Sequence, residues 1–190
     1  VVHTPAAELA LSSGLAVRVR NTYTDHPGTL VVDIASYRPA SVATAVSHAT
    51  DIARVRVSLA AEEGSPAHMG AQARVYRAMA DAGVSLDMFT PAGDSLLFTV
   101  PESDVAAASA VLAELGLAAD IRDHLAKVTL VGAGMHGVPG VMARVAEALN
   151  DAGVRALQTA DSHTTISVLL PAEDAERAVG ALHAAFGLGE

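Results

Sequence analysis

The chain has 190 residues, 51% of them hydrophobic and 17% charged, so it is long enough to bury a core and too apolar for a disordered segment. Its net charge of −9, with 12 basic against 21 acidic residues, argues against a nucleic-acid surface, because phosphate contacts need clustered Lys and Arg. The absence of cysteine excludes disulfides and thiolate chemistry, and no apolar run approaches the roughly 18 residues of a membrane span. No signal-peptide pattern occurs at the start, so the default expectation is a cytoplasmic protein.

The first part of the chain predicts a small unit of one helix and two strands. Pro5–Ser13 has the composition of a short helix that ends at Gly14. Leu15–Arg20 and Thr29–Val32 predict strands on either side of a loop rich in turn-forming residues. After a connector that contains Pro39, residues 42–46 predict a further strand.

The remaining chain repeats itself with an offset of 70 residues. Ala78–Val84 matches Ala148–Val154, and the matched single residues include Gly70 with Gly140 and Pro101 with Pro171. Two copies of one small module therefore follow each other. A pair of such modules forms a symmetric groove in which a small ligand can sit, so a ligand-binding role is the first hypothesis.

Each copy predicts a strand, a helix, a hairpin and a second helix. In the first copy Ala53–Leu59 is a strand, and apolar residues at helical spacing follow around Val75 and Met79. A hairpin with its turn at Pro91–Asp94, and in the second copy at Ala160–His163, comes next. With one more strand each copy becomes βαββαβ, so the fold class is α+β with two ferredoxin-like modules whose helices cover one face of an antiparallel sheet.

A glycine-rich stretch in the second copy matches the dinucleotide-binding pattern G-x-G-x-x-G. Gly132–Gly137 follows a strand and precedes a helix, as that pattern requires. Two features oppose a nucleotide role: the next strand turns back in a short hairpin rather than a crossover, and it carries Gln158 and Thr159 where a ribose-binding acid is needed. The same loop presents free N–H groups at a helix start, which suits the carboxylate of an amino acid.

Longer stretches resemble the regulatory region of aspartokinase, which carries tandem ACT modules. In the second copy these are Lys127–Met135, Val138–Val141, Ser167–Leu169 and Ala181–Phe186. At the N-terminus, His3–Ala10, Val17–Tyr23 and Pro27–Val31 resemble the end of the kinase domain. Leu157–Ile166 is most similar to the bacillus-type enzyme that responds to meso-diaminopimelate.

The resemblance implies a domain organisation and a set of partners. We expect the end of a kinase-like domain and a linker over 1–41, a strand for the second module within 42–52, the first ACT module over 53–120 and the second over 121–190. The family pairs its ACT modules between chains, which implies a homodimer, an amino-acid effector and a catalytic aspartokinase domain or subunit as partners. We expect no nucleic-acid partner because of the charge, no membrane partner because no apolar run is long enough, and no cofactor. We also expect no metal, since the chain has no cysteine and its scattered histidines show no helical zinc-site spacing.

The resemblance also points to effector-binding positions in both copies. These are Met69, Gly70, Gln72 and Asp87 in the first copy, and His136, Pro139, Gly140, Val141, Gln158 and Asp161 in the second. The loop N–H groups would take the effector's carboxylate, and an acid such as Asp87 its ammonium. The alternative for Asp87 is a solvated strand residue. The first copy lacks the Asp-x-Pro-Gly often seen before this helix and has Ala67–Gly70 instead, so its site is expected to be altered or empty.

Two functions remain open from the sequence. The first is feedback control of aspartokinase by lysine, threonine or meso-diaminopimelate, bound at the ACT interfaces. The phosphate-binding and aspartate-binding stretches of the kinase are missing, so we expect no catalytic residues and no aspartate phosphorylation by this chain alone. The alternative is a free-standing ACT sensor of amino acids that has no kinase partner.

Overall fold

The computed structural model describes residues 3–32, 42–59, 63–132, 135 and 138–189, which form a six-stranded and a two-stranded antiparallel sheet with five α-helices. None of these helices has the length and apolar character needed to cross a membrane. The elements in chain order are α1 Thr4–Ser12, β1 Val17–Val19, β2 Thr29–Val31, β3 Ala45–Ser58, α2 Pro66–Asp81, β4 Asp87–Ala92, β5 Ser95–Pro101, the 3-10 turn η2 Glu102–Asp104, α3 Val105–Glu114, β6 Ala119–Val131, α4 Val141–Asp151, β7 Gln158–Asp161, β8 Thr165–Pro171, the 3-10 turn η3 Ala172–Asp174 and α5 Ala175–Ala185.

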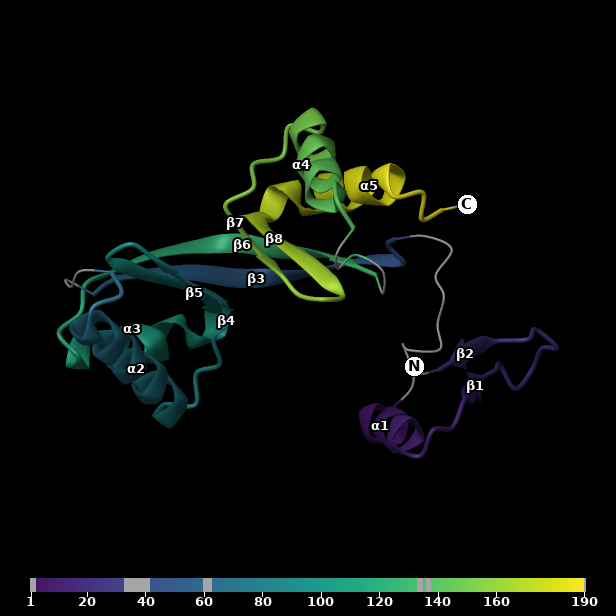
Figure 1. The fold of residues 1–190 in the computed structure, drawn as a ribbon, viewed down its shortest axis with the longest axis horizontal. Helices are drawn as coiled ribbons and strands as arrows, with labels where there is room; N and C mark the ends of the chain where they lie inside the picture. Colours follow the sequence, from purple (N-terminus) through teal and green to yellow (C-terminus); the bar gives the residue numbers. More distant parts are fainter. Residues whose placement is uncertain (1–2, 33–41, 60–62, 133–134, 136–137, 190) are drawn as a thin grey trace.

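The first three elements lie to one side of the large sheet (Figure 1). α1 has proline in its first turn, where a missing N–H removes no helical hydrogen bond, and it ends just before Gly14, which has a φ of 63°. β1 and β2 pair antiparallel, with Val17 opposite Val31. The predicted helix and both predicted strands are present, although the strands are shorter than expected.

Two long strands, β3 and β6, pair antiparallel through the middle of the large sheet. The expectation of separate strands over 42–46 and 53–59 was wrong, because β3 runs without a break from 45 to 58. Thr50 and Asp51 interrupt the apolar alternation in the sequence, and the register shifts there. Asp51 in β3 and His124 in β6 both have positive φ, 58° and 54°, so an irregularity in each strand absorbs the interruption.

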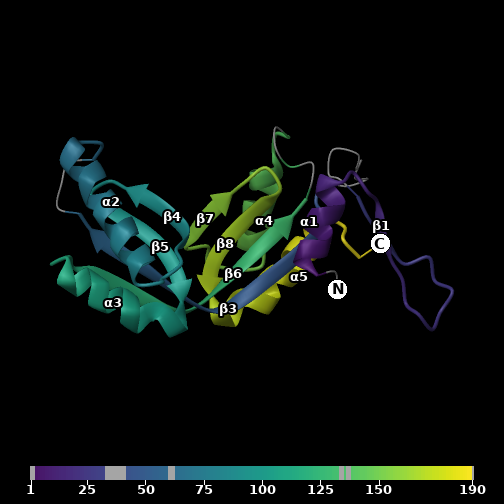
Figure 2. The ribbon, with the colours of Figure 1, turned by 90° about the horizontal axis from the view of Figure 1, so that it is seen from below.

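Each half of the strand pair belongs to a different repeat. The C-terminal half of β3 pairs with β5, and the C-terminal half of β6 pairs with β8. Module 1 is therefore β3-α2-β4-β5-α3-β6, and module 2 is β6-α4-β7-β8-α5 completed by the N-terminal half of β3. Both have the ferredoxin-like order. Helices α4 and α5 cover one face of the sheet and α2 and α3 the opposite face (Figures 1 and 2).

Each module has its own hydrophobic core, and a smaller cluster joins them. In module 1, Phe98 of β5 and Met79 of α2 are both 0% exposed. In module 2, Val145 of α4 packs with Leu170 and Leu182. The joining cluster is buried between the modules and consists of Met88, Leu125 and Leu169, with Ile52, Leu157 and Ala160 packed against it.

The β4–β5 hairpin turns more tightly than the sequence suggested. We expected a turn over Pro91–Asp94, but Pro91 and Ala92 lie within β4, and Ala92 pairs with Ser95. The turn is Gly93-Asp94, and Gly93 has the positive φ, 60°, that such two-residue turns require. Proline fits β4 because this is an edge strand. The other hairpin, β7–β8, is closed by the N–H of Ser162 donating to Thr165 O at 2.8 Å.

Candidate functional site

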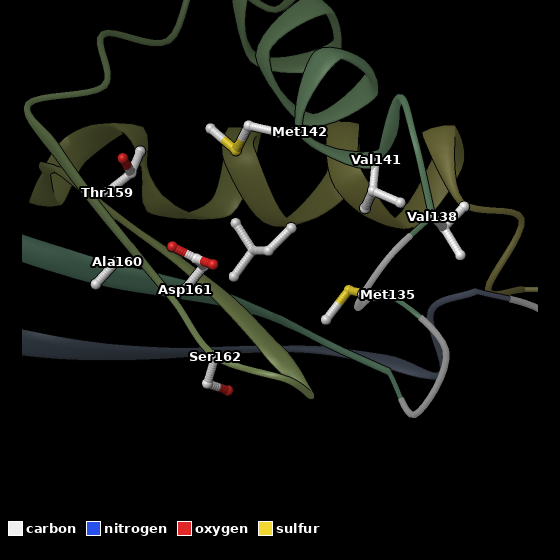
Figure 3. Close-up of a pocket in the computed structure, with 9 residues that line it drawn as sticks. Met135, Val138, Val141, Met142, Thr159, Ala160, Asp161 and Ser162 are labelled. Carbon is white, nitrogen blue, oxygen red and sulfur yellow. The ribbon is translucent and has the colours of Figure 1, made fainter.

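A cavity of about 340 Å³ lies in module 2 between the N-terminus of α4 and strand β7 (Figure 3). Its walls are mainly apolar, with hydroxyl and carboxylate groups along the β7 side. The lining residues are Met135, Val138, Val141, Met142, Thr159, Ala160, Asp161, Ser162 and Ile166. This volume and this mixture of surfaces suit a ligand of amino-acid size with both a polar and an aliphatic part.

The start of α4 contributes hydrogen-bond donors beside the cavity. Gly140 is the N-cap residue with a φ of 90°, a conformation that glycine adopts without strain. The first helical hydrogen bond described runs from Arg144 N–H to Gly140 O at 3.0 Å, and no side chain of the residues that the structure describes caps the helix. The N–H groups of the first turn therefore have no acceptor within the helix, and the helix dipole adds partial positive charge there.

Asp161 supplies the negative charge on the opposite wall. It is the last residue of β7, it is exposed, and Figure 3 shows its carboxylate facing the cavity across from Met142 and Val141. The neighbouring hydroxyl of Ser162 is already engaged, because it lies 2.8 Å from Thr165 Oγ1. The cavity thus places helix N–H donors and one carboxylate around an apolar floor that contains Ile166.

A second polar cluster lies at the junction of the two modules. The ammonium of Lys127 in β6 pairs with the carboxylate of Asp87 in β4. The side-chain amide of Gln158 in β7 donates to the backbone oxygen of Met88, which has a positive φ of 46°. Oε1 of Gln158 is buried and has no hydrogen-bond partner among the residues that the structure describes. These contacts tie the edge strand of one module to the strands of the other.

The ion pair changes the titration of Asp87. Burial by itself raises the pKa of this carboxyl, but the hydrogen bonds from Lys127 and from the N–H of Met88, with the charge of Lys127, outweigh burial and lower it. Because the folded-state pKa lies below the ordinary value of 3.8, the ion pair stabilises the fold above that pH, and the stabilisation is lost as pH falls through the folded-state pKa.

We therefore expect Lys127→Met to remove this part of the acid sensitivity. In the variant, Asp87 keeps the burial that raises its pKa and the Met88 N–H that lowers it, but loses the hydrogen bond and the charge of Lys127. The pKa of Asp87 is then lowered less, so less stability is lost when the carboxylate is protonated. Thermal denaturation between about pH 6 and about pH 2.5 measures the difference. A variant whose melting temperature falls with acid as steeply as that of the unmodified chain would show that the pair contributes nothing.

The structure separates nine of the ten positions expected to bind an effector into three groups. Val141 and Asp161 line the cavity, and Pro139 and Gly140 directly precede α4 beside it. Gln158 and Asp87 lie at the module junction. The remaining described positions lie in the first two turns of α2, where they are Met69, Gly70 and Gln72. His136 lies outside the described residues.

Sequence reasoning missed several residues that the geometry brings to these places. Met142 and Thr159 line the cavity, and Lys127 makes the ion pair of the junction. Lys127 is the only lysine of the chain and interrupts an apolar strand, which is a signal that the sequence did contain. Thr159 follows Gln158 on a strand, so the alternation of side chains puts the two on opposite faces.

The glycine motif has a structural role at its first position. A Cβ on Gly132 would lie 2.1 Å from the backbone oxygen of Val42 and 2.8 Å from Cα of Ala43. The N–H of Gly132 also donates to Thr164 O at 2.8 Å. Glycine is therefore required here by the close approach of another backbone, whatever the loop binds.

Gly132→Ala is accordingly expected to destabilise the fold by about 1–3 kcal/mol, the usual cost of forcing extra atoms into a packed site. Gly180→Ala is the matched control, since a Cβ at this site in α5 meets nothing within 4 Å and alanine favours a helix by about 1 kcal/mol. Urea denaturation of both variants measures these changes. Equal stability of the two variants would contradict the structural role of Gly132.

Comparison with known proteins shows which family has this architecture. The ACT domain family profile matches residues 120–184. Aspartokinase 1 of Bacillus subtilis (strain 168) is 35% identical over 198 residues, which cover 100% of this chain and 47% of the relative. Aspartokinase of Thermus thermophilus is 34% identical over 199 residues, covering 99% and 48%. The chain spans about half the length of the curated relatives it matches.

Solved structures give the same result at the level of the fold. The ligand-free regulatory subunit of aspartate kinase from Thermus thermophilus is 31% identical with a TM-score of 0.68, and the match covers 76% of this chain and 99% of that one. Aspartate kinase from Synechocystis is 27% identical with a TM-score of 0.71, covering 99% of this chain and 35% of that one. The two ferredoxin-like modules are ACT modules, and the chain belongs to the aspartokinase family, whose regulatory part it resembles.

Proposed function

We propose that this chain is the regulatory region of an aspartokinase and controls the kinase by binding an amino acid made from aspartate. The observation that carries the proposal is the near-complete match to the regulatory subunit of Thermus thermophilus, 99% of which is covered, together with a ligand-sized cavity in module 2. Lysine, threonine and meso-diaminopimelate are the candidate effectors. The resemblance to the Bacillus subtilis enzyme favours meso-diaminopimelate.

The cavity suits an amino-acid zwitterion. The effector's carboxylate accepts hydrogen bonds from the N–H groups at the start of α4, after Gly140. Its ammonium lies against the carboxylate of Asp161, and its aliphatic part packs on Met142 and Ile166. Each end of the zwitterion thus meets the opposite charge. A second cationic group, as in lysine or meso-diaminopimelate, is also favoured by the negative charge of the site.

The N-terminal unit suits a role as the contact with a kinase domain. Four leucines in and around α1, β1 and β2 are between 49% and 68% exposed, and Tyr23 is 94% exposed. The leucines are Leu9, Leu11, Leu15 and Leu30. The match to the regulatory subunit covers 76% of the chain, whereas the match to the longer Synechocystis kinase covers 99%, so the additional part resembles what precedes the ACT modules in whole kinases. Exposed apolar surface of this kind marks a site of contact with another protein, and we propose a kinase domain as that partner.

Isothermal titration calorimetry of the chain with each of the three amino acids tests the proposal. We expect saturable binding of at least one of them and no phosphate transfer when aspartate, ATP and magnesium are supplied to the chain alone. Absence of binding by all three, or turnover by the chain alone, would contradict it. Co-purification from the source cell distinguishes the free-standing sensor, which predicts no kinase in the complex.

We also expect the chain to be a homodimer with or without effector. Strands β4 and β7 are the two edges of the six-stranded sheet, and among the described residues each forms backbone ladder pairs with one neighbouring strand only. Exposed edges invite pairing with a second copy, which covers their unpaired N–H and C=O groups. Light scattering at micromolar concentration measures the mass. A monomer would contradict this expectation.

A further inference from the structure

The two repeats differ at the cavity although their folds agree. With the offset of 70 residues, every cavity residue of module 2 has a counterpart in module 1. The pairs, written with the module 2 residue first, are Met135 and Ser65, Val138 and His68, Val141 and Ala71, Met142 and Gln72, Thr159 and Phe89, Ala160 and Thr90, Asp161 and Pro91, Ser162 and Ala92, and Ile166 and Leu96. The counterparts show whether module 1 can hold the same kind of ligand.

The first helix of module 1 begins earlier than that of module 2. α4 begins at Val141, whose counterpart is Ala71, but α2 begins at Pro66. With about 3.6 residues per turn, α2 has more than one additional turn at its start. The local sequence explains the difference, because Ser65 caps α2 by accepting from His68 N–H at 3.2 Å, and proline suits the first helical position.

In module 2 the equivalent residues cannot extend the helix. Pro139 disfavours a helical conformation at the residue before it, and Gly140 has a φ of 90°. Gly70, the counterpart of Gly140, lies within α2. The Val-Pro-Gly sequence therefore holds residues 138–140 outside α4, whereas the counterparts His68–Gly70 lie within α2.

The additional turn buries two polar side chains at the positions of cavity residues. His68 is 1% exposed and Gln72 is 6% exposed, whereas their counterparts Val138 and Met142 are 42% and 44% exposed. Nε2 of Gln72 lies 3.1 Å from Nδ1 of His68, and the N–H of Gly64 lies 3.4 Å from the same ring atom. The two side chains thus satisfy each other inside module 1, where module 2 keeps its equivalents at the surface of the cavity.

Strand β4 also lacks the carboxylate that β7 offers to the cavity of module 2. Pro91 stands where module 2 has Asp161, so the strand provides no carboxylate at that position. The nearest acid on the same strand is Asp87, and Lys127 pairs with it at the module junction. Phe89, the counterpart of Thr159, packs its ring edge-on against Tyr76 with centroids 5.9 Å apart. The carboxylate of Asp161 and the hydroxyl of Thr159 are thus not reproduced at the equivalent positions of β4.

We infer that each chain has one effector pocket, in module 2, and that the equivalent pocket of module 1 is closed by its own additional helical turn through His68 and Gln72. The identity of the ligand rests on the proposed function, but the closure does not. Module 1 then serves as a scaffold that holds β3 and β6 and as the partner in the junction through Asp87 and Lys127.

Thiol labelling tests the closure without any ligand. The chain has no cysteine, so Gln72→Cys and Met142→Cys each introduce a single thiol at equivalent positions of the two modules. With a thiol-reactive dye we expect the Met142→Cys chain to react at least about tenfold faster, since a buried thiol reacts only when the structure opens locally. Equal rates in two folded variants would overturn the inference.

A graft tests the cause of the closure. His68→Val together with Met69→Pro, made in the Gln72→Cys chain, gives module 1 the Val-Pro-Gly sequence of module 2. The proline removes the hydrogen bond from Met69 N–H to Ser65 O, 3.0 Å long, and disfavours the first turn. We expect thiol reactivity to rise toward that of Met142→Cys, with circular dichroism verifying the fold. A folded graft with a protected thiol would show that the additional turn is not the barrier. If the graft unfolds, the comparison of the two single-cysteine chains decides.

Ligand protection separates this inference from the proposed function. Labelling is repeated with saturating lysine, threonine or meso-diaminopimelate. We expect the effector to slow labelling at position 142 and to leave position 72 unchanged, and calorimetry to give one site per chain. If none of the three amino acids slows labelling at either position, the proposed function is contradicted. The closure of module 1 is then tested by the labelling rates of the two single-cysteine chains alone. Protection at position 72, or two sites per chain, overturns the inference.

Discussion

Phe98→Ala is expected to lower the free energy of unfolding by about 3–5 kcal/mol, the range measured when a buried aromatic ring is removed and a cavity remains. Phe98 is 0% exposed in the core of module 1, on β5 next to β3. Because β3 and β6 run through both modules, we expect the loss to appear in one transition that includes module 2. If the modules unfolded separately, only the unfolding transition of module 1 would show the loss of stability.

A reporter in module 2 makes this measurable. The chain has no tryptophan, and Phe186 is 5% exposed in the core of module 2, so Phe186→Trp places one fluorophore there. Its ring lies 4.8 Å from the guanidinium carbon of Arg144, a contact that an indole retains. We expect the fluorescence midpoint in urea to shift with Phe98→Ala. An unchanged midpoint, with a shifted far-ultraviolet signal, would show that the modules unfold independently.

Asp161→Asn is expected to weaken effector binding roughly ten- to a hundredfold, because a hydrogen bond to a charged group contributes on the order of 1.5–3 kcal/mol. The substitution keeps the size of the side chain and removes only its charge. Asp161 lies at the exposed end of β7, so the fold should tolerate it. Calorimetry with the effector of the unmodified chain gives the change in Kd.

The matched control is Glu176→Gln, which removes the same charge from an exposed position on α5. A general effect of net charge, now −9, would weaken or strengthen binding equally in both variants. Normal binding by a folded Asp161→Asn chain would place the effector's ammonium elsewhere. It would not bear on whether module 1 is closed, since that rests on His68 and Gln72.

Much of the fold could be predicted because the repeat shows each pattern twice. Helical spacing around Val75 and again around Val145 predicted α2 and α4, and both helices are present. The continuity of β3 could not be predicted, because Thr50 and Asp51 break the alternation and only pairing with β6 reveals that the strand continues. Long-range pairing of this kind leaves no local signal.

The residues around the cavity and the module junction differ in how much local signal they carry in the sequence. The Val-Pro-Gly before α4 carries a strong local signal for a helix start, and the structure has Gly140 as the N-cap of α4 and Val141 in the lining of the cavity. His68 gave no such signal, since a histidine at a helix start is usually exposed, and its burial depends on how the additional turn meets the module 1 core. The pairing of Lys127 with Asp87 depends on two modules meeting, which no local pattern records.

The sharing of β3 between modules also sets the order in which the protein can fold during synthesis. Residues 45–49 leave the ribosome before any of module 2 exists, and their partners in β6 are residues 127–131. Contacts so distant in sequence form slowly, since the intervening loop must first be closed. Until then the N-terminal half of β3 extends from module 1 as an unpaired strand. This segment, Ala45–Ala49, has serine and histidine next to its single valine. A strand of this composition has little tendency to aggregate before its partner strand is synthesised.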